Sequence, residues 1–250
     1  MNRRGRPVVL LLTLAATTLT PPRAPVATFA AVAAADDPKL ALLAKPADPA
    51  PKLPEKIPEA FAKLLDPRGV KLTGADGKAV CSAWLVSEVA LAAKPTSELQ
   101  VKLATIPFGT LIGALEVAGP MTDYRNQAIA PGCYALRTGW QPSDGNHLGT
   151  SSSRDFAVVT SFAKDKDPAP VAKLDDLVPL SVAASPTDHL LALYVAEPEG
   201  DPPKSGEARL FKRESKEEWA ADLTLHGKAP GAKTATALRI GLVLIGHVSE

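Results

Sequence analysis

The residues best suited to chemistry gather in one polar loop, residues 141–155, which lies between two strand-like segments. The loop contains Asp144, His147 and Asp155, and His189 follows later in the chain. Carboxylates and imidazoles are ligands for Zn²⁺ and other divalent metals, and the Asp-x-x-His spacing lets both side chains reach one ion. A metal-dependent hydrolase using these four residues is therefore one hypothesis. The alternative is a polar loop with a turn at Asp144 and with His147 solvated or bonded to the backbone.

Arginines form a second group around this loop. Arg125, Arg137 and Arg154 could clamp a carboxylate or phosphate of a ligand through paired hydrogen bonds. The alternative is internal pairing with acids such as Asp123 and Asp155. Strand alternation places Arg137 on a half-buried face where it would need a partner, which favours internal pairing.

The same region allows two further interpretations. A serine of residues 151–153 could join His147 in a catalytic triad, but the chain has no Gly-x-Ser-x-Gly elbow, so a solvated turn is favoured. Tyr134, Trp140 and Gln141 could form a sugar-binding surface with His147, although alternation places both aromatic rings on a face expected to be core. The candidate binding residues are thus Arg137, Gln141, Asp144, His147, Asp155 and His189.

The N-terminal segment has the pattern of an export signal. Arg3, Arg4 and Arg6 precede an apolar stretch at residues 8–19, and small residues 33–35 fit a cleavage site. The apolar stretch is short for a membrane span, which needs ~20 residues. We expect residues 1–35 to be a signal peptide, the protein to be periplasmic or secreted, and no membrane span to remain after cleavage.

Charge excludes one class of partner. Removing residues 1–35 takes away four arginines and no acid, so 24 basic residues face 27 acidic ones and the net charge falls from +1 to −3. Such a chain offers no overall basic face for nucleic acid. An envelope component or a small ligand is the expected partner.

The two cysteines, Cys81 and Cys133, lie in separate strand-like segments. Outside the cytosol such a pair can oxidise, and closing the intervening loop would stabilise the fold by ~4 kcal/mol in the chain-entropy model. The equally weighted alternative is two unpaired, small apolar side chains.

Short apolar segments separated by Gly and Pro predict an all-β fold. The expected strands are residues 80–86, 99–106, 110–117, 133–140, 154–162, 190–195, 208–212, 219–225 and 234–248. Short helices are expected at 58–65 and 171–178, with 215–222 as a competing helix. Many short strands with such turns favour an antiparallel β-sandwich, jelly-roll-like, with one or two short helices. Residues 36–56, rich in Pro and Ala, form a tether before a single domain at 57–250.

A set of short motifs between Asp123 and Phe156 resembles a group of uncharacterised secreted bacterial β-sandwich proteins. The matching sequences are DYR at 123–125, IAPG at 129–132, YALR at 134–137, QP at 141–142, DGNH at 144–147, Gly149 and RDF at 154–156. The resemblance implies an exported sandwich fold and no particular activity. Cys133 stands where the resemblance leads us to expect an aliphatic residue.

These observations together predict an exported, envelope-associated binding or structural module with no catalytic activity. The metal-dependent hydrolase, with a site at the 141–155 loop and a divalent metal as cofactor, is the alternative.

Overall fold

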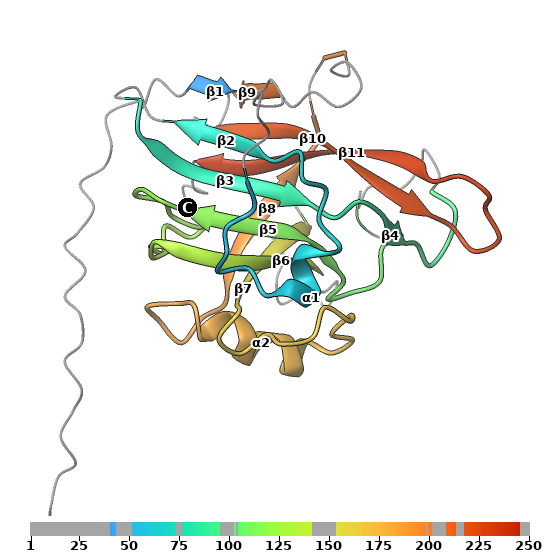
Figure 1. Cartoon of the computed structure of the whole chain (residues 1–250), viewed down its shortest axis with the longest axis horizontal. Helices are drawn as coiled ribbons and strands as arrows, with labels where there is room; N and C mark the ends of the chain where they lie inside the picture. The colour runs from blue at the N-terminus through green and yellow to red at the C-terminus, as the bar shows by residue number, and fades with distance from the viewer. Residues whose placement is uncertain are drawn as a thin grey trace, which may run out of the picture. The chain divides into compact units, whose positions relative to one another are not determined.

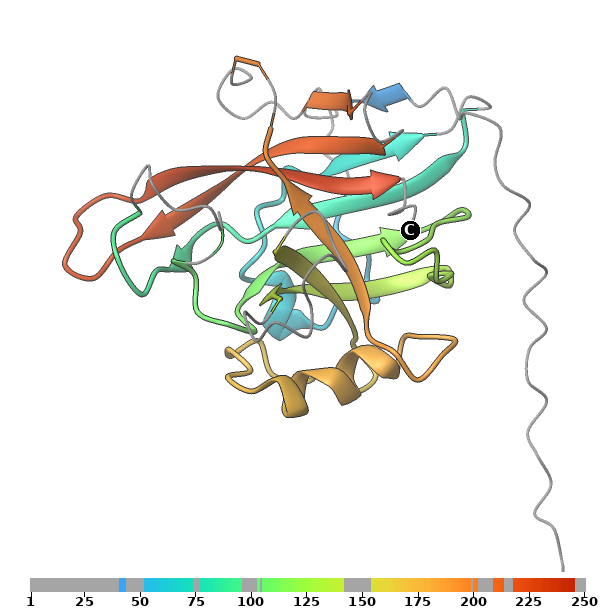
Figure 2. The ribbon, with the colours of Figure 1, turned by 180° about the vertical axis from the view of Figure 1, so that it is seen from behind.

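The computed structural model describes residues 41–43, 52–73, 77–95, 103, 105–141, 154–198, 200–201, 209–213 and 218–245. The strands form one continuous, strongly curled sheet, a half-barrel (Figures 1 and 2). The strand order is β1-β2-β3-β5-β6-β7-β8-β11-β10-β4, and β9 also pairs with β10. Every pairing is antiparallel except that of β10 with β4, so the sheet is mixed.

The elements follow the chain in a simple order. The strands are β1 (Ala41–Leu43), β2 (Val70–Thr73), β3 (Ala79–Leu85), β4 (Val89–Ala90), β5 (Leu111–Val117), β6 (Gly132–Trp140), β7 (Asp155–Ser161), β8 (Leu191–Ala196), β9 (Arg209–Arg213), β10 (Glu218–Lys228) and β11 (Thr236–Ile245). The helices are α1 (Glu59–Ala62) and α2 (Leu174–Val182).

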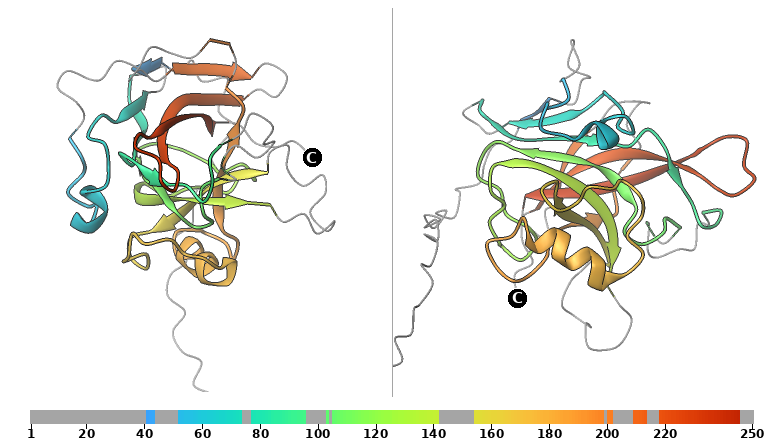
Figure 3. Two further views of the ribbon diagram at one scale, coloured as in Figure 1. Left: turned by 90° about the vertical axis from the view of Figure 1, so that its right-hand side faces the viewer. Right: turned by 60° about the horizontal axis from the view of Figure 1, so that its bottom comes forward.

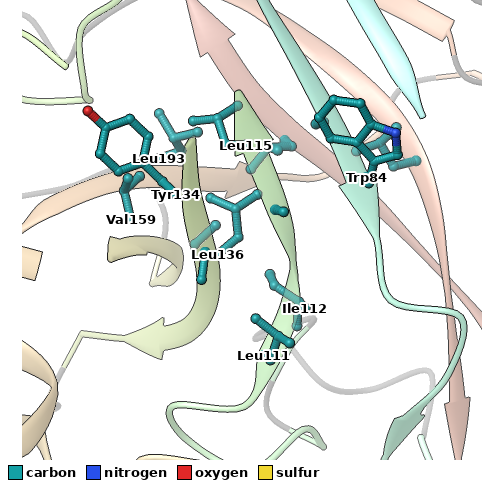
Figure 4. Packing of buried hydrophobic residues seen from close by; sticks show 14 of the residues in the cluster. Trp84, Leu111, Ile112, Leu115, Tyr134, Leu136, Val159 and Leu193 are labelled. Atoms are coloured by element: carbon teal, nitrogen blue, oxygen red, sulfur yellow. The ribbon is translucent and has the colours of Figure 1, made fainter. Parts of the chain in front are cut away.

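The core fills the inner face of the curled sheet. The strand registers place Leu115, Leu136, Val159, Leu193 and Leu242 on one face, and each is buried. Leu115 of β5 and Leu242 of β11 belong to the same buried cluster, although their strands are far apart in the sheet order. Figure 4 shows part of this cluster, with Leu115, Leu136, Val159 and Leu193 near Tyr134. The interior is a packed core of mainly aliphatic side chains.

The outer face is covered in two places. Phe61 of α1 packs edge-to-face on Phe162, with ring centroids 5.0 Å apart, over the β5–β6 side. A smaller buried cluster lies outside β7, β8, β11 and β10, where Phe156 and Tyr194 pack against Ala220 and Val243. Both faces of several strands are thus buried, which explains why their sequences are continuously apolar.

The all-β prediction with two short helices is confirmed, but the structure is one curled sheet and the expectation of two stacked sheets is corrected. Register shifts at Leu72/Thr73, Leu111/Gly113 and Trp219/Ala220 interrupt the ladders. Such bulges increase local twist and let a single sheet curl round its own core.

One local prediction differs from the structure, and one choice between alternatives is decided by it. Residues 105–106, expected at the end of a strand, lie in a turn and a bend. Residues 218–222, weighed as helix or strand, are strand, which confirms the expected strand at 219–225. In the second segment Ala221 faces the core and Asp222 faces outward, so alternation along β10 decides the conformation.

Candidate functional site

The structure places four of the six predicted site residues. Asp144 and His147, and with them serines 151–153, lie outside the described residues. Arg137, Gln141, Asp155 and His189 are described, and each occupies a different environment.

The proposed four-residue metal site does not form, because Asp155 and His189 lie far apart. Asp155 is the first residue of β7. Leu191, at the start of β8, pairs with Val159, which lies four residues or about 13 Å further along β7 than Asp155. His189 precedes Leu191 by two residues and is exposed. Metal ligands must all lie within ~2 Å of one ion. No cluster of three or more His, Cys, Asp or Glu suited to a metal occurs among the described residues.

Arg137 is buried and fully paired inside the protein. Its Nε and Nη2 donate to the two carboxylate oxygens of Asp165 at 2.7 and 2.8 Å. Nη1 donates to the carbonyls of Gly109 and Ala169, both at 2.8 Å, and Nη2 also donates to the carbonyl of Asp167. All five N–H donors of the guanidinium are therefore used, so the residue is not available to clamp a ligand.

The local structure around Arg137 explains this arrangement. Thr160, on the neighbouring strand β7, donates its hydroxyl proton to Asp165 at 2.6 Å. Gly109 has a φ of 67°, and a Cβ at this position would lie 2.0 Å from the carbonyl oxygen of Val171. Only glycine lets the chain before β5 approach the segment before α2 so closely. The Arg137–Asp165 pair thus fastens two loops to the outside of the sheet.

The DYR sequence at 123–125 also has an internal role. The buried Asp123 carboxylate accepts hydrogen bonds from the backbone N–H groups of Arg125 and Gln127, both at 2.9 Å, and from the Gln127 side chain at 2.8 Å. Arg125 donates to the carbonyl of Leu190 at 2.7 Å. Burial raises the pKa of the Asp123 carboxyl, while its hydrogen bonds act in the opposite direction. These contacts fasten the β5–β6 connection to the start of β8.

Tyr134 and Trp140 do not form one sugar-binding surface. They lie six residues apart on β6, about 20 Å along the strand. Tyr134 is buried, and its hydroxyl donates to the carbonyl of Ala130 at 2.7 Å. Trp140 is half-buried and packs edge-to-face on Phe108, with ring centroids 5.1 Å apart.

The best remaining candidate for a ligand-binding surface therefore lies at the end of β6 and the start of β7. This surface, the β6–β7 end, consists of Phe108, Trp140, Gln141 and Arg154, with the buried Asp155 next to Arg154 in the chain. The backbone N–H of Gln141 donates to the carbonyl of Arg154 at 2.9 Å, and Asp155 accepts the N–H of Leu103 at 3.2 Å. Gln141 is half-buried and Arg154 is exposed. Two packed aromatic rings at the end of a strand pair can stack on a ligand.

The cysteines are free thiols, so the disulfide alternative is corrected. Cys81 on β3 pairs with Val117, whereas Cys133 on β6 pairs with Glu116. The two side chains thus lie on opposite faces with β5 between their strands, a separation of about 10 Å that exceeds disulfide reach. Burial raises the pKa of Cys81 to about 12 and also raises that of Cys133.

Sequence reasoning missed two residues of these sites. Asp165 is buried and pairs with Arg137, yet it lies in the polar sequence KDKDP that reads as a solvated loop. Phe108 was expected only as part of a turn between strands, although it supports Trp140. The useful signal for Asp165 was Arg137 itself, because a buried guanidinium requires a nearby acid.

No helix among the described residues has the length and apolar character needed to cross a membrane. Comparison with known proteins adds no identity: no family model, no curated protein and no solved structure matches the chain.

Proposed function

We propose that the protein is an exported, envelope-associated binding module without catalytic activity, and that it contacts an envelope glycan or a small ligand through the β6–β7 end. Export is supported by the basic residues and the apolar stretch at the N-terminus. The absence of catalysis is part of the proposal.

One observation carries the choice of surface. Trp140 is only half-buried, and its ring packs edge-to-face on Phe108 at the point where β6 ends. Arg137 and Asp123, two other conspicuous polar residues of the region, form their hydrogen bonds inside the protein. A partly exposed, rigidly supported indole gives stacking area at a low entropic cost.

The interior of the curled sheet supports the same choice. Its side chains are aliphatic and buried, so a ligand held inside the sheet would have to displace the core. A surface at the end of two strands needs no such displacement.

The experiment uses the full-length exported protein, with soluble N-acetylglucosamine oligomers and insoluble cell-wall glycan as probes. Isothermal titration and co-sedimentation measure binding, and tryptophan fluorescence reports on the indole. We expect Trp140→Ala to weaken binding about five- to thirtyfold, since stacking on a sugar is worth roughly 1–2 kcal/mol. Trp219→Phe, at another half-buried tryptophan, is the matched control and should bind as the wild type does.

Binding that survives both Trp140→Ala and Phe108→Ala would contradict the assignment of the surface. Hydrolysis of either glycan probe by the wild type would contradict the non-catalytic part of the proposal.

A further inference from the structure

The outer half of the β10–β11 hairpin projects beyond the curled sheet (Figures 1 and 3). This segment, residues 226–238, is called the ribbon below. Its base is braced by β4, where Val89 and Ala90 pair with Gly227 and Lys228. The N–H of Leu91 donates to the carbonyl of Lys228 at 2.9 Å, so the ribbon is fixed where it leaves the sheet.

The ribbon is basic although the whole chain is nearly neutral. Residues 226–239 and the bracing segment 89–95 contain no Asp or Glu, whereas the whole chain has a net charge of +1. Lys94, Lys228 and Lys233 are exposed. None of the three takes part in an ion pair in the described part of the chain. Their charges are therefore available to a partner.

The ribbon also has an open strand edge. Strand β11 pairs with β10 along its length, but β8 joins it only at Gly241 and Leu242. Within the described residues, Thr236, Ala237 and Leu238 thus have a strand partner on one side only. An open edge presents backbone N–H and C=O groups to which an extended peptide can add as a further strand. The small side chains of Thr236 and Ala237 leave room for such a strand.

We propose that the ribbon binds an extended acidic segment of a partner protein, which adds as a strand along the outer edge of β11. Backbone hydrogen bonds would supply affinity, and the lysines would select carboxylates. A second copy of this chain is a poor occupant, because two ribbons side by side would bring lysines of like charge together. This proposal uses no residue of the β6–β7 end.

The test measures fluorescence anisotropy of labelled peptides added to the full-length protein. The probe is a ten-residue peptide that alternates Glu with Thr or Val, and its counterpart carries Lys in place of Glu. We expect the acidic peptide to bind, the basic one not to bind, and Lys228→Glu/Lys233→Glu to weaken binding at least about tenfold. The matched control is Lys164→Glu/Lys173→Glu, which reverses two exposed lysines near α2 and should bind as the wild type does.

A second probe separates strand addition from charge alone. The acidic peptide with alternate backbone nitrogens methylated keeps every carboxylate but loses the N–H groups that a strand must donate. We expect its affinity to fall at least about tenfold. Equal affinity of the methylated and unmethylated peptides would overturn the proposal, as would equal binding by the control and ribbon variants. Inorganic polyphosphate that binds more tightly than the peptide and displaces it would also overturn the proposal in favour of a polyanion site.

Discussion

Arg137 and the lysines of the ribbon are cations of one molecule in opposite surroundings. Arg137 is fully buried and donates to one carboxylate and three carbonyls. Lys228 and Lys233 are exposed on a projecting hairpin without an ion pair among the described residues. In the sequence Arg137 stands in the motif-rich region and the lysines in an unremarkable run of Ala and Thr. The comparison shows that the conspicuous polar residues around Arg137 build the scaffold, while the plain segment leaves its lysines exposed.

The largest expected loss of stability tests this comparison with three Arg–Asp pairs of decreasing burial. The side chains are 0% and 2% exposed for Arg137–Asp165, 24% and 0% for Arg239–Asp222, and 55% and 22% for Arg68–Asp66. We expect Arg137→Met to cost about 3–5 kcal/mol of unfolding free energy, because it leaves Asp165 buried without its cation. Arg239→Met should cost about 1–3 kcal/mol, and Arg68→Met less than about 1 kcal/mol.

Urea unfolding of the three variants measures this series. Arg137→Met/Asp165→Leu is the control for an uncompensated charge and should recover part of the loss. Equal stability of Arg137→Met and the wild type would show that the Arg137–Asp165 pair does not stabilise the fold. Arg137 would then again be a candidate binding residue.

Replacing Asp123 should have the next largest effect. Asp123→Ala leaves the N–H groups of Arg125 and Gln127 without their acceptor, and we expect a loss of about 2–3 kcal/mol. Asp123→Asn keeps one acceptor oxygen and should lose about half as much. Thermal unfolding followed by circular dichroism measures both variants. A wild-type midpoint for Asp123→Ala would mean that the DYR sequence is free for another role.

The thiols give a qualitative test of the sheet register. Under non-reducing conditions the intact protein should carry two free thiols, since β5 separates the strands of Cys81 and Cys133. A thiol reagent should modify half-buried Cys133 slowly and buried Cys81 only after unfolding, because burial raises both pKa values. Mass spectrometry counts the modified thiols. A disulfide in the native protein would contradict the register.

The smallest expected effect is the pH dependence that Asp123 adds. Burial raises its pKa in the folded chain, so the folded chain binds this proton more tightly than the unfolded chain does. Its contribution to stability should therefore increase as pH falls through the folded pKa towards the ordinary value near 3.9. The stability difference between wild type and Asp123→Asn, measured from pH 7 to pH 4, should shift in favour of the wild type. The opposite slope would show that the hydrogen bonds to the carboxylate outweigh burial.

Sequence patterns predicted the strands well but could not predict how they associate. Alternation in residues 133–140 and 154–162 places Leu136 and Val159 on an inner face whether the sheet stacks on another or curls on itself. The choice depends on bulges such as the one at Leu111/Gly113, which leave little trace in composition. For this reason the fold class was predictable and the single curled sheet was not.

Site residues were harder to predict, because spacing along the chain does not fix register across strands. A shared metal site required Asp155 and His189 to lie close together, but the antiparallel register of β7 with β8 places them at opposite ends of the strand pair. The internal pairing of Arg137 was foreseen from its place in an alternating strand, although its partner Asp165 was not. Trp140 was expected in the core and is only half-buried, and it is the last residue of β6.

Hydrogen–deuterium exchange on the full-length protein, with and without the acidic ten-residue peptide, tests the central contrast most directly. We expect the amides of Gly109 and Thr138, which are hydrogen-bonded beside Arg137, to exchange only on global unfolding with or without peptide. Alternate N–H groups of β11 bond to β10, and the remaining amides of residues 236–238 point to the open edge. We expect these outward amides to exchange quickly and to become protected when the peptide binds. Rapid exchange beside Arg137, or no change at residues 236–238 under saturating peptide, would contradict this contrast.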